Sequence, residues 1–169
     1  ALYGTADLAF WQNQLQAENL SPYRVDGKAG LVVSATELMY MGWRFRELTF
    51  SIYVCNPQDA NQPGDIFLIH AFNSSRMFAW MERSMFQTPY YHGKVQVEDK
   101  IPASFTLNDG QAVALNARMS GVVPRLRGKN EMWQGAIHLP KRMTKNIGGF
   151  FYAKLGGYTE TFPFSPSMD

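Results

Sequence analysis

The chain has 169 residues, of which 46% are hydrophobic and 14% aromatic, and its formal net charge is +2. This length fits one domain spanning residues 1–169, and the apolar content excludes a disordered chain. The small charge argues against a nucleic-acid partner. The apolar runs are far shorter than the ~20 residues of a membrane-spanning helix, so we expect no membrane partner. The lone Cys55 favours a reducing, cytoplasmic location.

The first forty residues predict a helix followed by a short strand. Residues 5–19 carry apolar side chains at the helical period, with Thr5 or Asp7 as the cap and Asn19 as a left-handed terminator. Residues 31–34 predict a short strand. Residues 35–41 fit a helix by composition and a strand by length, so both alternatives remain open at this point.

The next segment predicts two strands joined by a loop. Residues 44–55 alternate in polarity, which is typical of a strand. The loop covers residues 56–65, which are rich in turn formers, and residues 66–72 return as a strand. The polar face of the first strand carries Glu47, Thr49, Ser51 and Tyr53.

Residues 73–98 predict a helix that feeds a strand. Asn73 or Ser74 is expected to cap the helix, and Pro89 to end it. Methionines four residues apart predict an apolar helix side in the core. From Tyr91 the period changes to two, which predicts a strand. The methionines are Met77, Met81 and Met85, and the polar face of the strand carries His92, Lys94, Gln96 and Glu98.

The last seventy residues predict only strands. Residues 103–107 and 111–120 flank an Asn-Asp-Gly turn, which indicates a hairpin. Residues 132–139 and 150–155 alternate as further strands, and a Gly-Gly pair is expected to break or bulge the chain before residues 158–164. The prediction is an α+β, mainly antiparallel β domain with two or so helices, arranged as a sandwich or as a closed or partly closed barrel.

Several stretches in order along the chain resemble the acetoacetate decarboxylase-like superfamily. They are Glu37–Tyr40 with Phe45–Leu48, Phe72–Arg76, Phe86–Val95 and Phe151–Gly157. The resemblance implies a β-barrel or double-sheet cone around a small-molecule cavity, often in a homo-oligomer. The decarboxylases carry two adjacent lysines after the proline, one of which forms a Schiff base, whereas this chain has Tyr90 and Tyr91 there. The resemblance therefore implies a divergent branch, with lyase, decarboxylase or isomerase chemistry on a small carbonyl or carboxylate compound.

The catalytic candidates are His92, Glu47 and Lys94. His92 and Lys94 share a strand face about 7 Å apart, where a histidine moves protons near neutral pH and a lysine binds an anion or forms an imine. The alternative is that this face is merely solvated. Glu47 is expected either to move a proton beside the ligand-binding hydroxyls of Ser51 and Tyr53, or to pair structurally with an arginine.

The remaining ligand-binding candidates are Arg46, His70 and Tyr91. Arg46 either extends its head group to solvent at a strand end or clamps an anionic ligand. His70 is expected on the same strand face as Leu68 and Phe72, as a core residue or as part of the site. We expect no cofactor and no metal, although His70, His92 and Glu47 would suit a metal if they converged. The competing hypothesis is a non-catalytic barrel, including a calycin-like pocket for an apolar ligand, given 12 Phe and 8 Tyr.

Overall fold

The structure is a computed structural model that describes residues 1–56, 59–98, 103–109, 112–118, 126–144 and 149–161. A sheet of eight strands follows the order β1-β3-β4-β5-β10-β11, with β2 beside β3 and β6 beside β5, and a second sheet has the order β7-β8-β9. The first sheet comprises β1 (Leu2–Ala6), β2 (Arg24–Val25), β3 (Lys28–Tyr40), β4 (Trp43–Asn56), β5 (Asp59–Asn73), β6 (Tyr90–His92), β10 (Leu126–Leu139) and β11 (Gly149–Thr161). The second comprises β7 (Lys94–Glu98), β8 (Ser104–Asp109) and β9 (Ala112–Arg118), and the helices are α1 (Leu8–Gln16) and α2 (Arg76–Met85).

Most strand pairs are antiparallel, as the sequence predicts, and the two helices complete an α+β fold. Two pairings are parallel, β5 with β10 and β5 with β6. In the part of the chain that the structure describes, the sheets do not close into a barrel: β1 and β11 lie at opposite ends of the strand order. The closed form therefore stays a prediction.

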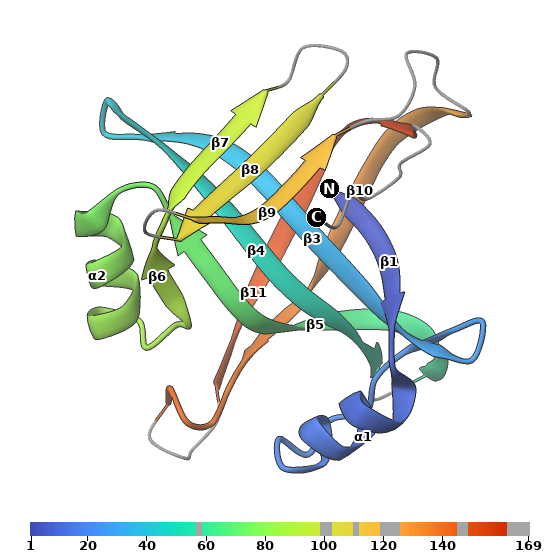
Figure 1. The fold of residues 1–169 in the computed structure, drawn as a ribbon. Helices are drawn as coiled ribbons and strands as arrows, with labels where there is room; N and C mark the ends of the chain where they lie inside the picture. The colour runs from blue at the N-terminus through green and yellow to red at the C-terminus, as the bar shows by residue number, and fades with distance from the viewer. Residues whose placement is uncertain (57–58, 99–102, 110–111, 119–125, 145–148, 162–169) are drawn as a thin grey trace.

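The two sheets pack face to face around the main core. Figure 1 shows β7, β8 and β9 lying across the long strands β3 and β4. Alternation along β4 sends Leu48 into this layer, where it is fully buried against Val95 and Leu107 of the smaller sheet. Burial of one such leucine contributes roughly 1.5–3 kcal/mol. A second cluster, around Leu15 and Ile52, fixes α1 against the sheet.

The chain begins with a strand that the sequence did not predict. Residues 2–6 pair with β3, so α1 starts only after Asp7, whose carboxylate accepts a hydrogen bond from the Phe10 amide at 2.6 Å. Asp7 rather than Thr5 is therefore the cap. Asn19 has a φ of 60°, which confirms it as a left-handed residue after the helix.

Several strands are longer than predicted, because pairing with a neighbour overrides local turn preference. β3 runs through residues 28–40 without a break, which resolves the ambiguity at 35–41 in favour of a strand. β5 already begins at Asp59, inside the predicted loop, with register shifts against β4. β11 continues through Gly156 and Gly157, which pair with Met132 and Glu131.

The helix α2 is shorter than predicted and is capped by a different residue. Ser75 is the cap, and its hydroxyl accepts a hydrogen bond from the Phe78 amide. The helix ends at Met85, before Pro89. Met77 and Met85 are exposed, so the prediction that the methionine side lies in the core is wrong for both. Neither α2 nor any other helix of the described residues has the length and apolar character needed to cross a bilayer.

The predicted strand from Tyr91 is divided at Gly93. β6 belongs to the larger sheet and β7 to the smaller one, so the chain changes sheets at this glycine. Gly93 is buried, and a Cβ atom built there would lie 2.9 Å from Leu107 Cδ1 and 3.0 Å from Phe72 Cδ1. The close packing of the two sheets therefore requires glycine at this crossing point.

Candidate functional site

Three neighbouring strands bring polar side chains together on one face of the larger sheet. Glu47 of β4 is the register partner of Asn73 of β5, and Asn73 is the register partner of His92 of β6. Tyr90 precedes His92 by two residues and therefore points to the same face. The helix α2 lies beside β6 at this end of the sheet (Figure 1).

Glu47 is held by a hydrogen bond to each carboxylate oxygen. The Tyr90 hydroxyl donates to Oε2 at 3.0 Å, and the Asn73 amide Nδ2 donates to Oε1 at 2.9 Å. Asn73 is itself buried, and its Oδ1 accepts from the Ser75 amide at 2.8 Å, which orients the side-chain amide. The Glu47 carboxyl is thus fixed in position while its residue remains partly exposed.

The protonated form of this carboxyl is favoured by its surroundings. Burial raises the pKa of Glu47, the Tyr90 hydrogen bond opposes that rise, and the negative charge of Glu82 adds to it. Burial also raises the pKa of Tyr90, and the Glu47 charge raises it further. The pKa of Glu82 is raised by burial as well, although the Thr88 hydroxyl donates to its carboxylate at 3.2 Å.

A carboxyl with a raised pKa and a neutral phenol beside it are the components of a proton-transfer site. Because its pKa is raised, the carboxyl keeps its proton to a higher pH than an ordinary surface glutamate does. The hydrogen bonds from the phenol and the amide fix its orientation. The sequence predicted Glu47 as a site residue but did not predict its two hydrogen-bond partners, Tyr90 and Asn73.

The other two predicted catalytic residues lie on the surface. His92 is exposed at the end of β6, two strands away from Glu47 on the same face. Lys94 is exposed on β7, which belongs to the smaller sheet. Since Lys94, Gln96 and Glu98 are all exposed while Val95 is buried, the polar face of β7 is solvated. The structure does not place Lys94 in a desolvated setting with Glu47.

The hydroxyls predicted to accompany Glu47 lie farther along β4. Ser51 is buried, and its Oγ has no hydrogen-bond partner among the described residues. Burial raises the pKa of Tyr53 to about 12, and the nearby Tyr3 contributes. Tyr53 Cβ and Cδ2 lie within 4 Å of where a Cβ of Gly30 would be, so this ring covers β3. Neither hydroxyl bonds to Glu47.

His70 and Tyr91 form a stacked pair away from the Glu47 site. Their ring planes differ by 3° with centroids 4.4 Å apart, and Arg83 Cζ lies 4.6 Å from the Tyr91 centroid. Burial lowers the pKa of His70, and the charges of Arg142 and Arg83 lower it further.

The predicted face of His70 needs a correction. Phe50 pairs with His70 but Ser51 pairs with Leu68, so β5 has one extra residue there, a β-bulge. The bulge turns Leu68 to the face opposite His70, whereas His70 and Phe72 remain together. The convergence of His70, His92 and Glu47 on a metal does not occur, and in the described part of the chain no three histidine, cysteine or acidic side chains form a metal-ligand group.

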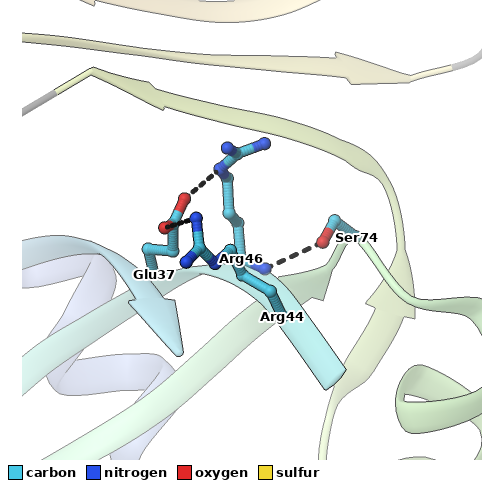
Figure 2. Close-up of polar contacts among 4 residues, drawn as sticks. All are labelled: Glu37, Arg44, Arg46 and Ser74. Atoms are coloured by element: carbon cyan, nitrogen blue, oxygen red, sulfur yellow. Dashed lines mark hydrogen bonds and ion pairs between the residues drawn. The ribbon is translucent and has the colours of Figure 1, made fainter. Parts of the chain in front are cut away.

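Arg46 forms an ion pair with Glu37, which the sequence did not predict as a site residue. Its Nε donates to Glu37 Oε2 at 2.8 Å, and Arg44 lies 3.5 Å from the other oxygen (Figure 2). The Arg46 backbone amide donates to the Ser74 hydroxyl at 2.8 Å, which ties β4 to the segment before α2. Both arginines thus share one ionic partner, Glu37, across the β3–β4 pair.

A second, partly buried polar pair was not predicted because its members are distant in the sequence. His138 Nε2 lies 2.9 Å from Asp65 Oδ2, and the Ala136 amide donates to Asp65 Oδ1 at 2.9 Å. The His138 side chain is 20% exposed. The parallel pairing of β5 with β10 creates this contact.

An open groove lies elsewhere, between α1 and the end of β4. Its volume is about 910 Å³. Cys55 lies in its wall, with Sγ 3.5 Å from the Pro22 carbonyl oxygen. The groove is lined by Gln12, Asn13, Gln16, Leu20, Ser21, Pro22, Tyr23, Arg24 and Cys55. None of the predicted catalytic residues lies in it.

Comparison of the chain with protein-family models, with curated proteins and with solved structures found no match.

Proposed function

We propose that the chain binds a small carbonyl compound beside Glu47 and that Glu47 transfers a proton to or from the carbon next to the carbonyl. The observation that carries this proposal is the Glu47 carboxyl, which has a raised pKa and one hydrogen bond to each oxygen, from Tyr90 and Asn73. Such chemistry belongs to isomerases and lyases, the classes implied by the resemblance to the acetoacetate decarboxylase-like superfamily.

The charge of the site favours a neutral ligand. Glu47 and Glu82 lie close enough for the charge of Glu82 to raise the pKa of Glu47. A carboxylate ligand would add a third negative group to this part-buried region, whereas a neutral ketone or aldehyde would not. Of the two compound classes that the sequence suggested, we therefore favour the neutral carbonyl compound.

The proposal does not use an imine. A lysine becomes a good amine nucleophile when desolvation or a neighbouring cation lowers its pKa. Lys94 is exposed, with exposed Gln96 and Glu98 on its own strand face. Treatment with borohydride and a small ketone is therefore expected to modify Lys94 no faster than another exposed lysine such as Lys28, and selective modification of Lys94 would restore the imine mechanism.

Deuterium exchange tests the proposal directly. Wild-type protein in D₂O is mixed with acetone or cyclohexanone, and loss of the α-proton signals is followed by NMR against the same solution without protein. Glu47→Gln is expected to abolish the protein-dependent exchange because the amide takes up no proton at neutral pH. Glu98→Gln is the matched control, since Glu98 is an exposed carboxylate on β7, and it is expected to exchange like wild type.

The competing function is a barrel that binds without catalysis. It predicts that a ketone perturbs the NMR signals of Tyr90 and Asn73 while no α-proton exchanges faster than in buffer. The calycin-like variant predicts instead that fatty acids quench the tryptophan fluorescence. Either result, obtained with Glu47→Gln behaving like wild type, would remove the proton-transfer function.

A further inference from the structure

The tip of the β3–β4 hairpin is an exposed cluster of large apolar side chains. We call Leu38, Met39, Tyr40, Met41 and Trp43 the hairpin tip. Met41 is 82% exposed, Met39 71% and Trp43 66%. Soluble monomers rarely expose a continuous apolar patch larger than a few hundred Å², and such a patch marks a protein or membrane contact.

The apolar character of the hairpin tip extends to both sides of the ribbon. Successive strand residues point to opposite faces, so Met39 and Tyr40 project in opposite directions, yet both are exposed. Tyr40 and Trp43 are the last paired residues of the hairpin. Met41 and Gly42 therefore form the turn, with φ values of 49° and 82°. Asparagine commonly occupies the first of these positions, whereas here a methionine projects from the turn.

The hairpin tip is continuous with apolar residues of α2. The Phe78 ring lies 6.2 Å from the Tyr40 ring and 4.6 Å from the Phe45 ring, measured between centroids. The same helix exposes further large apolar side chains at helical spacing. These are Met77, Trp80 and Met85, followed by Phe86. Figure 1 shows the helix and the hairpin at the same side of the molecule.

Arginines stand directly behind the apolar residues. Arg44, whose side chain is 70% exposed, follows Trp43, and Arg46 lies two residues farther along β4. Both arginines pair with the single carboxylate of Glu37 (Figure 2), so these three residues together carry a net positive charge. Arg76, at the start of α2, is exposed as well.

We propose that the hairpin tip inserts into the headgroup region of a bilayer that contains anionic lipid. A ribbon that is apolar on both sides needs a medium that surrounds it, which acyl chains provide and a flat protein surface does not. Tryptophan and tyrosine prefer this interface, and arginines behind them meet lipid phosphates. Trp43 and Arg46 are three residues apart on β4, which is about 10 Å at the rise of a strand and matches the depth of interfacial elements.

The charge also argues against a second copy of the chain as the occupant. A two-fold contact through the hairpin tip would place the Arg44 side chains of both copies near each other, and like charges at an interface are unfavourable. The sequence predicted no membrane partner because it has no spanning segment. A surface-inserted hairpin is a different mode of contact, and it is independent of the proton-transfer function.

Vesicle co-sedimentation tests the proposal. Wild-type protein is mixed with vesicles of phosphatidylcholine containing 30% phosphatidylserine, or of phosphatidylcholine alone. We expect binding to the anionic vesicles and weaker binding to the neutral ones. Met41→Ser combined with Trp43→Ser is expected to weaken binding by tenfold or more, since each removes an inserted apolar side chain. Arg44→Gln is expected to weaken binding to anionic vesicles only, and less strongly.

Phe150→Ser is the matched control, because Phe150 is 67% exposed on β11, outside the hairpin tip, and its variant is expected to bind like wild type. All variants are compared by circular dichroism so that a misfolded protein is recognised. No sedimentation with either vesicle, or equal loss in the Phe150 variant, would overturn the proposal. So would a change of oligomeric state in the Met41 and Trp43 variant without lipid, which would identify the tip as a protein interface.

Discussion

The Tyr90 phenol donates a hydrogen bond to Glu47 Oε2 at 3.0 Å, across the two strands β4 and β6, which both lie beside β5. The two residues are 43 positions apart in the chain. Their contact depends on the parallel pairing of β6 with β5, which places Tyr90 opposite Ala71. This contact holds the Glu47 carboxyl in position in the candidate site.

Tyr90→Phe is expected to raise the pKa of Glu47 further. The hydrogen bond from Tyr90 favours the charged carboxylate and so lowers the pKa. Without it, burial and the Glu82 charge raise the pKa of Glu47 further. The variant is also expected to lower the free energy of unfolding by about 1–3 kcal/mol, the usual cost of a missing hydrogen-bond partner. A ¹³C NMR titration of the Glu47 carboxyl measures the first effect. An unchanged or lower pKa would show that the phenol does not stabilise the carboxylate.

Glu47→Gln is expected to change how stability depends on pH. The folded-state pKa of Glu47 is raised above the unfolded value of 4.5, so between these two values the folded protein holds more protons than the unfolded protein. The free energy of unfolding contributed by Glu47 therefore falls as pH rises through this window. Urea unfolding at a series of pH values from 4 to 8 should show a steeper fall in wild type than in Glu47→Gln. Parallel curves would contradict the raised pKa.

Arg142→Gln is expected to raise the pKa of His70. The Arg142 charge is the second cause, after burial, of the lowered pKa of this imidazole, because a nearby cation disfavours the imidazolium. An NMR titration of the His70 Hε1 signal measures the change. Arg24→Gln, in the groove beside α1, serves as the control and should leave the titration unmoved. If the His70 titration had the same midpoint in both variants, the Arg142 charge would have no effect on the pKa of His70.

Gly93→Ala is expected to destabilise the fold by about 1–3 kcal/mol, the usual cost of overpacking a core. Its new Cβ would lie 2.9 Å from Leu107 Cδ1 and 3.0 Å from Phe72 Cδ1, where the two sheets meet. Gly4→Ala is the control, since nothing lies within 4 Å of a Cβ there. Thermal or urea unfolding compares the two variants. Equal stability of both would mean that the sheets adjust freely at the crossing.

The sequence predicted the fold class because strand periodicity is local. Alternation along residues 44–55 identified β4, and the Asn-Asp-Gly turn identified the β8–β9 hairpin. Strand ends were predicted less well. β5 starts at Asp59 in spite of nearby prolines and glycine, because its partner β4 continues to Asn56.

The site was predicted in part, for a similar reason. Glu47 was proposed as a site residue because it stands on the polar face of a strand. Tyr90 and Asn73 were missed because their contact with Glu47 requires the order of β4, β5 and β6, which no local pattern reports. His70 shares its face with Phe72 as predicted, but the prediction that Leu68 lies on that face was wrong, because a bulge that periodicity does not reveal reverses the alternation between Leu68 and His70. The only local signal that could have drawn attention to Tyr90 was its position directly after Pro89.

The pH dependence of α-proton exchange tests the central claim most directly. If the Glu47 carboxylate is the base, the protein-dependent exchange of acetone in D₂O rises with pH, and its midpoint equals the pKa of Glu47 measured by NMR. In Tyr90→Phe both midpoints are predicted to move upward together. An exchange profile that stays fixed in Tyr90→Phe while the Glu47 titration moves, or that persists in Glu47→Gln, would contradict the account.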